Sequence, residues 1–229
     1  MARATWISWS TRVKFYSSLI EKEHDMSIND ATRKLLLEFE VGGGENYYNQ
    51  KLKSPIWPGE ASGVTIGVGY DLGYNSAETI RADWSPHLGE PVLARLVTCA
   101  GKTGLTAKAA RNTVKDIVVP WEAAFAVFQS VTVPKFTRQT RSAFPGFDDL
   151  NANCQGALIS LVFNRGAAMN GDRRKEMRAI RDLVPGKDYE GIAGELKKMK
   201  RLWVGTTIEN GMNRRRDAEA ALAKAPVTA

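Results

Sequence analysis

The sequence is poor in the residues that build disulfide frameworks and metal centres. Its 229 residues include two cysteines and two histidines. Two cysteines are too few for a disulfide framework, so we expect Cys99 and Cys154 to be reduced, buried thiols. His24 and His87 have no cysteine or acidic partner at the spacing of metal ligands, and we therefore expect no metal site.

Long apolar runs, repeats and nucleotide-binding motifs are missing as well. No segment reaches the about eighteen apolar residues of a membrane span, so we expect no stable membrane insertion. The N-terminal segment lacks the continuous apolar core and small-residue cleavage site of a secretory signal. The glycines at 67, 69 and 73 are spaced G-x-G-x-x-x-G with no βαβ pattern after them, which excludes a dinucleotide loop. We expect no cofactor.

The sequence carries an excess of positive charge. Lysine and arginine number 32 against 25 aspartates and glutamates, which gives a formal net charge of +7. Such an excess favours an anionic partner, and nucleic acid, an anionic membrane or the bacterial envelope all qualify. The basic run RRKEMRAIR at 173–181 is typical of a solvated amphipathic helix, and no aromatic residues interleave with it. We therefore expect no nucleic-acid partner.

Local signals divide the first part of the chain. Residues 1–27 form an N-terminal extension that we expect to be partly helical. Asn29 or Asp30 can cap a helix that runs to about Glu40, where the glycines at 42–44 end it. The stretch that follows is rich in glycine and proline, and it predicts a loop-rich β-lobe at about 41–74.

From Asn75 onward the pattern is helical. Asn75 and Thr106 are expected to cap helices, and the segment 121–131 is apolar enough for a packed helix. Asn153 opens a helix that is apolar nearly all round at 157–163, which predicts a place at the centre of a bundle. Three further helices are expected at about 173–184, 188–203 and 213–224.

These elements predict an α+β, mainly α fold. With 43% hydrophobic residues the chain can bury a sizeable core, and we expect residues 28–229 to form one catalytic domain. A small β-hairpin lobe then lies beside a larger helical lobe at about 75–225. A cleft between two such lobes is a natural site for a ligand.

The segment SGVTIGVGYDLG at 62–73 is the most informative one. Val64, Ile66 and Val68 alternate with small residues, which is typical of a half-buried strand. The other face carries Thr65 and two glycines, Gly67 and Gly69, which normally weaken a strand. We interpret this face as a backbone cleared for an extended ligand, with Thr65 directed at it.

Glu40 is the first candidate acid. It lies at the C-terminal end of an apolar helix, where the helix dipole disfavours a carboxylate and so favours the protonated form that a general acid needs. Glu60, in the turn before the strand, is the candidate second carboxylate, because glycoside hydrolysis uses two carboxylates in different environments. Asp71 is the alternative, although a hydrogen-bonding role in its turn is slightly favoured for it.

Three segments carry a resemblance to a known family. EVGGG followed by SGVTIGVGYDLG resembles the Glu…Thr-Ile-Gly-x-Gly signature of the phage-type lysozymes, glycoside hydrolase family 24. ALISLVFNRG at 157–166 resembles the central helix of that family, and GMNRRRDAEAAL at 211–222 resembles its C-terminal Arg-Arg pattern. The segments occur in the order of the family.

The resemblance implies a muramidase that cuts the β-1,4 bonds of bacterial peptidoglycan. It implies Glu40 as the catalytic acid and Thr65 as the cleft threonine, while the catalytic aspartate of the family has no clean counterpart, which leaves Glu60 as the substitute. It also implies that Arg215 or Arg216 approaches the catalytic glutamate. Tyr70 stands where many members have histidine, so a pesticin-like or toxin-like branch is a closer match.

The remaining candidate site residues are assigned to substrate binding. Asn164, at the end of the central helix, can hydrogen-bond an N-acetyl group of the glycan. The full set of candidate substrate-binding residues is Gly67, Gly69, Tyr70, Asp71, Asn164 and Arg215.

Two other functions remain open. The same fold can support a lytic transglycosylase, in which a hydroxyl of the substrate attacks in place of water. A non-catalytic peptidoglycan-binding or virion structural protein is the alternative outside the enzymes. In the favoured interpretation the protein is a monomer, made in the bacterial cytoplasm and acting on the periplasmic cell wall as a phage lysis protein or a bacterial toxin.

Overall fold

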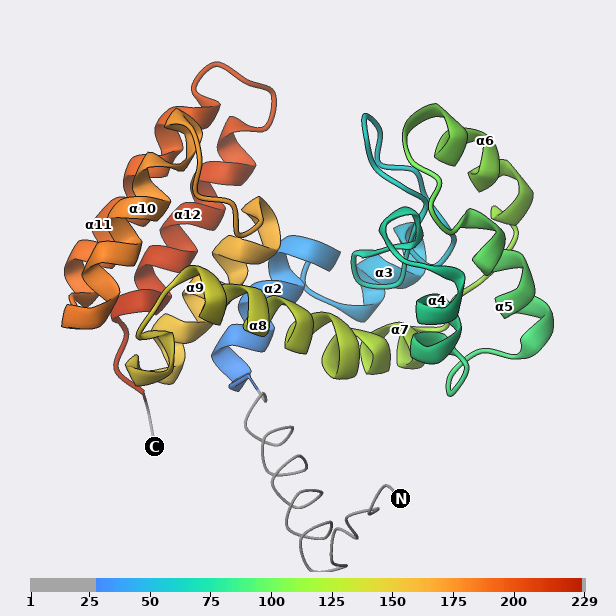
Figure 1. Ribbon diagram of the computed structural model, residues 1–229, viewed down its shortest axis with the longest axis horizontal. Coiled ribbons are helices and arrows are strands. Elements are labelled where there is room, and N and C mark those ends of the chain that lie inside the picture. The colour runs from blue at the N-terminus through green and yellow to red at the C-terminus, as the bar shows by residue number, and fades with distance from the viewer. Residues whose placement is uncertain (1–27, 228–229) are drawn as a thin grey trace, which may run out of the picture.

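The protein is mainly helical and contains one small sheet. The computed structural model describes residues 28–227, and Figure 1 shows the arrangement of its elements. The sheet has two antiparallel strands, β1 and β2. An α+β, mainly α fold is therefore confirmed. The predicted extension at 1–27, with its helix, lies outside the described residues.

The elements fall into two groups joined by a long helical connection (Figure 1). One group surrounds the hairpin and contains α3 (Glu45–Lys51), β1 (Thr65–Ile66), β2 (Tyr70–Asp71), α4 (Ala77–Trp84), α5 (Glu90–Leu96) and α6 (Gly104–Val114). Helix α2 (Asp30–Val41) belongs to the other group, which we call the helical group. The later helices are α7 (Trp121–Val127), α8 (Val133–Ala143), α9 (Ala152–Arg165), α10 (Lys175–Leu183), α11 (Tyr189–Lys198) and α12 (Glu209–Lys224). A π-helical turn at 128–132 joins α7 to α8.

Helix α2 begins and ends as its local sequence predicts. The Asn29 side chain accepts a hydrogen bond from the Thr32 amide and caps the first turn. Gly42 adopts a left-handed φ of 56°, and its amide bonds back to the Leu37 carbonyl. Because the helix ends there, Glu40 lies in its last turn.

The stretch after α2 differs from the expected loop. It contains helix α3, on which Tyr48 is buried and donates a hydrogen bond to the Val119 carbonyl, 2.9 Å away. That partner is 71 positions further along the chain. The loop prediction was therefore wrong at α3, because a distant contact stabilises the helix.

The predicted strand is a short hairpin. Val64, Ile66 and Val68 are buried as the alternation predicted. Pairing, however, is limited to Thr65 with Asp71 and Ile66 with Tyr70. Gly67 and Gly69 have φ values of 57° and 70°, so they form the turn between β1 and β2. The glycines are required by the turn geometry.

Helix α9 lies at the centre of the helical group. Most of its side chains are buried, and it packs against α2, α8 and α12. Its cap is Asn151, whereas Asn153, the expected cap, is buried and hydrogen-bonds the Asn29 side chain. The expected caps of α4 and α6 are likewise displaced: Ser76 caps α4, and Thr103 precedes α6.

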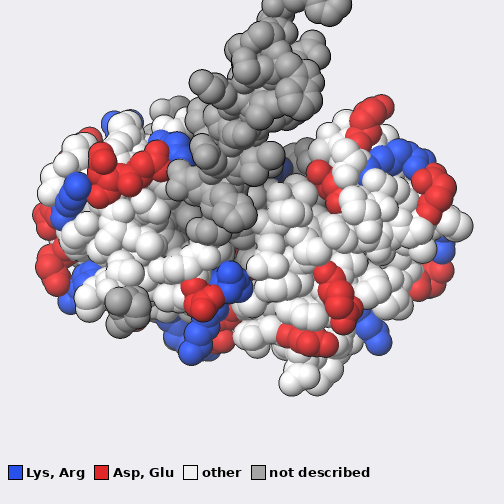
Figure 2. All heavy atoms as spheres, turned by 90° about the horizontal axis from the view of Figure 1, so that it is seen from below, with Lys and Arg blue, Asp and Glu red and all other residues white. Residues whose placement is uncertain are grey.

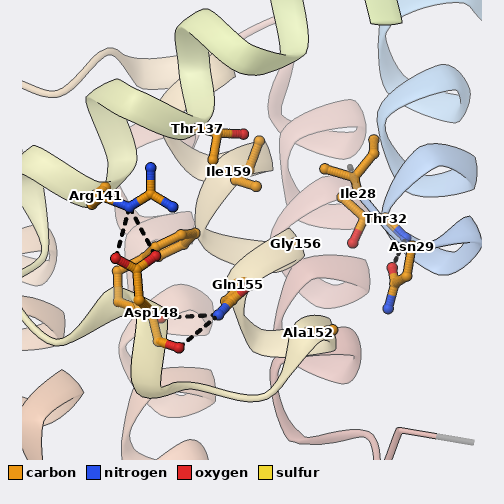
Figure 3. Close-up of a pocket in the computed structure, with 11 residues that line it drawn as sticks. Ile28, Asn29, Thr32, Thr137, Arg141, Asp148, Ala152, Gln155, Gly156 and Ile159 are labelled. Carbon is orange, nitrogen blue, oxygen red and sulfur yellow. Dashed lines mark hydrogen bonds and ion pairs between the residues drawn. The ribbon is translucent and has the colours of Figure 1, made fainter. Parts of the chain in front are cut away.

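Helices α2 and α9 approach each other very closely at Gly156. Figure 3 shows Thr32 of α2 opposite this glycine, beside a cavity of about 110 Å³. A Cβ atom at position 156 would lie 1.7 Å from Thr32 Oγ1. The glycine thus permits the contact that places the last turn of α2 beside the middle of α9.

Helices α4, α5 and α6 lie beside the hairpin, although the expected helical lobe begins at about residue 75 (Figure 1). Gly63 forms a β-bridge with Thr103, which ties the hairpin segment to the start of α6. Cys99 and Cys154 are free and buried, as predicted. Across residues 28–227, none of the helices has the length and apolar character needed to span a bilayer.

Candidate functional site

Glu40 forms an ion pair with a residue from the other end of the described chain. Arg215 of α12 donates from Nη1 to Glu40 Oε1 over 2.7 Å. The side chain of Glu40 is 19% exposed and that of Arg215 is 5% exposed. The last turn of α2 contains no basic residue, so the compensating charge comes from α12. Glu40 therefore reaches solvent while held by a buried guanidinium group.

A second, fully buried carboxylate holds Arg215 in place. Glu219 Oε1 accepts from Arg215 Nε at 3.2 Å, from Arg216 Nη2 at 2.8 Å and from the Ser160 hydroxyl at 2.7 Å. Arg215 also donates to the backbone carbonyl of Ser160. Two arginines thus balance two carboxylates, which is what makes buried charge tolerable.

Asn164 belongs to the same network. Its side-chain oxygen accepts from Arg216 Nη2 at 3.2 Å, and the guanidinium of Arg216 lies 5.7 Å from the centre of the Trp203 ring. Burial lowers the pKa of Arg216, while the charge of Glu219 acts in the opposite direction. Asn164 itself is exposed, so it lies where the network meets solvent.

The network joins three segments that are far apart in the sequence. Glu40 comes from the end of α2, Ser160 from α9 and Arg215 from α12. These are the segments that carry the family resemblance in the sequence. Their convergence in one set of hydrogen bonds agrees with the implied approach of an arginine to Glu40.

Thr65 lies on the hairpin, and among the described residues no hydrogen bond joins it to Glu40. Its backbone pairs with Ile56 and faces Asp71, and its side chain is half-buried. The tip of the hairpin is close to α9: a Cβ on Gly69 would lie 3.5 Å from the Phe163 ring. Phe163 is one turn from Ser160, so the hairpin tip and the network border the same helix.

Glu60 is not part of the network. It is exposed, has a positive φ of 46°, and forms no ion pair with residues 28–227. Asp71 has a structural role in the turn, the interpretation that its sequence slightly favoured. Its carboxylate accepts hydrogen bonds from the amides of Gly63 and Gly73 at 2.9 and 2.8 Å.

The interpretation of Gly67 as a contact point for ligand needs correction. Gly67 is buried, and a Cβ there would lie 2.9 Å from the Trp84 ring. The space is filled by the indole of the protein itself. Gly69, in contrast, is exposed at the tip of the hairpin.

Tyr70 is buried, and its hydroxyl bonds to a carboxylate. It donates to Asp83 Oδ2 over 2.5 Å and packs edge-on against Trp84. Burial, with a further contribution from Asp83, raises the pKa of Tyr70 well above its usual range. A cavity of about 560 Å³ is lined by Gly69, Tyr70 and Asp71 together with residues of α8. A ligand in this cavity would lie beside Tyr70.

Sequence reasoning missed Ser160 and Glu219. Ser160 is a polar residue inside an otherwise apolar helix, and Glu219 follows Arg215 by four positions on α12. A hydroxyl in such a helix needs a partner, and residues four apart on a helix are neighbours. Those two signals mark each residue separately as a candidate buried polar group, but they do not show that the two side chains pair with each other.

One comparison with known proteins gives a match. Residues 35–138 match a family described as a domain of unknown function, DUF8812. The match contains Glu40 and the hairpin, and it ends within α8, before Ser160 and Arg215. No curated protein matches the chain.

Proposed function

We propose that the protein is a lysozyme-like glycoside hydrolase that cleaves the β-1,4 bonds of bacterial peptidoglycan. The observation that carries the proposal is the convergence of Glu40, Ser160 and Arg215 from three separated segments. Each segment resembles one block of the phage-type lysozymes. The fold alone would not specify the chemistry, so the proposal rests on the site.

Glu40 is the general acid in this proposal. Its proton passes to the glycosidic oxygen as the bond to the anomeric carbon breaks, which leaves Glu40 as a carboxylate. Water then forms a bond to the anomeric carbon and returns a proton to Glu40. Arg215, at 2.7 Å, stabilises that carboxylate and fixes its orientation. Since Arg215 also bonds Glu219, its charge is shared between two acids.

The glycan lies, in the proposed complex, between the hairpin and α9. Thr65 on β1 positions a sugar or the attacking water, and exposed Asn164 contacts an N-acetyl group. The exposed hairpin tip at Gly69 borders the same space, because it neighbours Phe163. In this proposal the region serves as the substrate cleft.

A lytic transglycosylase is the second candidate. It is favoured by the positions of the two other acids, since Glu60 is exposed in a turn and Asp71 is bonded to two backbone amides. A transglycosylase needs no second carboxylate, because the 6-hydroxyl of the muramic acid attacks its own anomeric carbon. Glu40 then accepts the proton of that hydroxyl after protonating the leaving oxygen.

The experiment is the mass spectrometry of muropeptides released from purified sacculi. Wild type is expected to release products, with reducing ends for hydrolysis and anhydro ends for a transglycosylase. Glu40→Gln should lower the rate by at least about 100-fold, the usual contribution of a general acid. Glu38→Gln is the matched control, because Glu38 lies two residues earlier on α2 and pairs with exposed Arg214.

Two results would contradict the proposal. Release at the wild-type rate by Glu40→Gln would remove Glu40 from the mechanism. Sacculi that bind the wild-type protein and yield no soluble product would favour the non-catalytic peptidoglycan-binding alternative.

A further inference from the structure

Next to the Glu40 network, the helical group contains a further pocket, which we call the arginine pocket. It has a volume of about 530 Å³ and is lined by Arg165, Arg173 and Arg174, with Trp203 and Ile208 among its apolar residues. Arg165 ends α9, and the other two arginines precede α10. Asn164 of the Glu40 network also lines it, so the pocket adjoins the proposed glycan site. None of these three arginines takes part in the proposed reaction.

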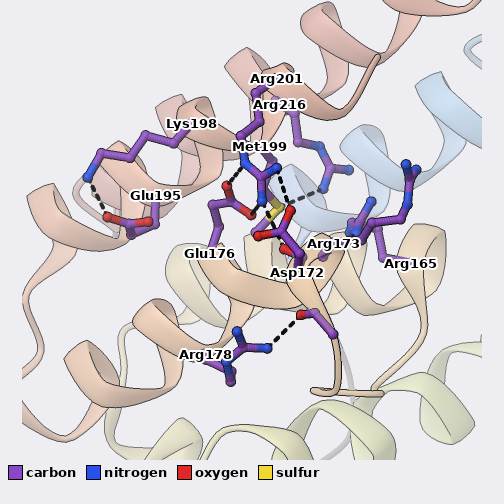
Figure 4. A network of polar contacts seen from close by, with 11 residues as sticks. Arg165, Asp172, Arg173, Glu176, Arg178, Glu195, Lys198, Met199, Arg201 and Arg216 are labelled. Carbon is purple, nitrogen blue, oxygen red and sulfur yellow. Dashed lines mark hydrogen bonds and ion pairs between the residues drawn. The ribbon is translucent and has the colours of Figure 1, made fainter. Parts of the chain in front are cut away.

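The positive charge of the arginine pocket is not neutralised by the protein. Within residues 28–227, none of its three arginines forms an ion pair. The nearby acids Asp172 and Glu176 both pair with Arg201, as Figure 4 shows. Three guanidinium groups therefore share one pocket without a carboxylate.

Backbone carbonyls satisfy only part of the donor capacity. Arg165 Nη2 donates to the Arg173 carbonyl, and Arg174 Nη2 donates to the Arg165 carbonyl. These bonds fix the guanidinium groups but add no negative charge. Arg165 Nε is buried with no hydrogen-bond partner, and the side chain of Arg173 forms no polar contact with the part of the chain that the structure describes.

Mutual repulsion within the arginine pocket also lowers the pKa of Arg165. Burial, followed by the charges of Arg174, Arg216 and Arg173, lowers the pKa of Arg165 to about 10. Stacking of Arg165 on the Trp203 ring, with 5.3 Å between the guanidinium and the ring centre, holds the group in place despite this repulsion. An anion in the pocket would relieve it.

We propose that the arginine pocket binds a phosphate group. Guanidinium groups present several donors in a plane and match the oxygens of phosphate, and three of them fit a doubly charged group better than a single carboxylate. Ile208 is 55% exposed and lines the rim, and Val204 nearby is 70% exposed. A ligand with an apolar portion beside its phosphate would contact this rim.

One face of the molecule carries charges of both signs. On the face shown in Figure 2, basic and acidic side chains are interspersed and form no patch of one sign. A site of this kind selects a phosphate group at one place, whereas general attraction to an anionic surface would need a continuous basic face.

The test is a calorimetric titration of the full-length protein with inorganic phosphate in a buffer free of other oxyanions, at fixed chloride. We expect saturable binding to one site, and much weaker binding of acetate. Arg173→Gln should raise Kd at least about ten-fold, because it removes a charged donor. The folded state should tolerate this change, since Arg173 is exposed and its side chain forms no hydrogen bond or ion pair with residues 28–227.

Two further variants complete the test. Arg181→Gln lies on α10 outside the pocket and should bind phosphate like wild type. Glu40→Gln should also bind like wild type, so a failure of the proposed hydrolase function would leave this proposal intact. Absence of saturable binding, or equal binding by wild type and Arg173→Gln, would overturn it.

Vesicles distinguish the sources of the phosphate group. Sedimentation with vesicles that contain phosphatidic acid, lost on Arg173→Gln and absent with phosphatidylcholine alone, would assign a lipid headgroup. Binding of inorganic phosphate without sedimentation would assign a soluble phosphate compound.

Discussion

Arg215 and Glu40 are 175 positions apart in the chain and form an ion pair of 2.7 Å. The pair joins α12 to α2 at the point where α2 ends. Arg215 is anchored by Glu219 and Ser160, both fully buried. Glu40, the partially exposed member, therefore has a fixed position on a rigid support.

Replacement of Arg215 by methionine should destabilise the protein strongly. It leaves the buried Glu219 with only Arg216 as its charge partner and removes the partner of Glu40. Breaking a buried pair by removing one member costs ~3–5 kcal/mol. Urea unfolding monitored by circular dichroism measures the loss.

Arg214→Met is the control for that substitution. Arg214 is the preceding residue of α12, and its pair with Glu38 is exposed at 3.3 Å. Its loss should change the free energy of unfolding by less than ~1 kcal/mol. Equal effects of the two substitutions would contradict the anchoring role of Arg215.

Gly156→Ala should separate α2 from α9. The new Cβ would lie 1.7 Å from Thr32 Oγ1 and 2.7 Å from Thr32 Cβ, so one helix must shift. Overpacking of this kind costs ~1–3 kcal/mol or more. Because α2 carries Glu40, we also expect a loss of activity on sacculi larger than the loss of folded protein explains.

The matched control is Gly194→Ala on α11. No atom lies within 4 Å of a Cβ built there, so the substitution meets open space. Helix propensity should then stabilise the protein by ~0.5–1 kcal/mol. If thermal unfolding shows Gly156→Ala to be as stable as Gly194→Ala, the close approach of α2 and α9 would be disproved.

The parts of the fold that the sequence predicted are those with local causes. Asn29 and Gly42 delimit α2 through contacts within their own turns. The apolar residues of 157–163 mark the central helix because each face of it is buried. In both cases the information lies within a few residues of the element.

The parts that were missed depend on distant partners. Helix α3 is stabilised through Tyr48 and Val119, and Gly67 is enclosed by Trp84, which lies on another element. At the site, Glu40 was identified from its helix end and the resemblance, whereas the pairing of Ser160 with Glu219 requires knowledge that α9 and α12 are adjacent. No local pattern contains that information.

Asp71 should matter for stability more than Glu60. Asp71→Ala leaves the amides of Gly63 and Gly73 without their acceptor, and two hydrogen bonds to a charged group are together worth ~3–6 kcal/mol. Glu60→Ala removes an exposed side chain and should change stability by less than ~0.5 kcal/mol. Urea unfolding of both variants checks the order, and the reverse order would contradict the turn role of Asp71.

The buried thiol of Cys154 should make the protein less stable in alkali. Burial raises the pKa of Cys154 from its ordinary value of 9.0 to about 12. Between these values the unfolded chain has lost the thiol proton while the folded chain keeps it. The unfolded state then binds fewer protons, so the free energy of unfolding falls as the pH rises, by up to ~1.4 kcal/mol per pH unit for one thiol.

Cys154→Ala isolates this contribution. The variant keeps every other titrating group, including Tyr48 and Tyr70, whose pKa values burial also raises. Urea unfolding at several pH values from 8 to about 10.5 should therefore give a shallower decline for the variant than for wild type above pH 9, in line with the linkage relation. The cavity left by the substitution lowers the free energy of unfolding equally at every pH, so it does not change how steeply that free energy declines with pH. Parallel curves would mean that the thiol titrates alike in the folded and unfolded chains.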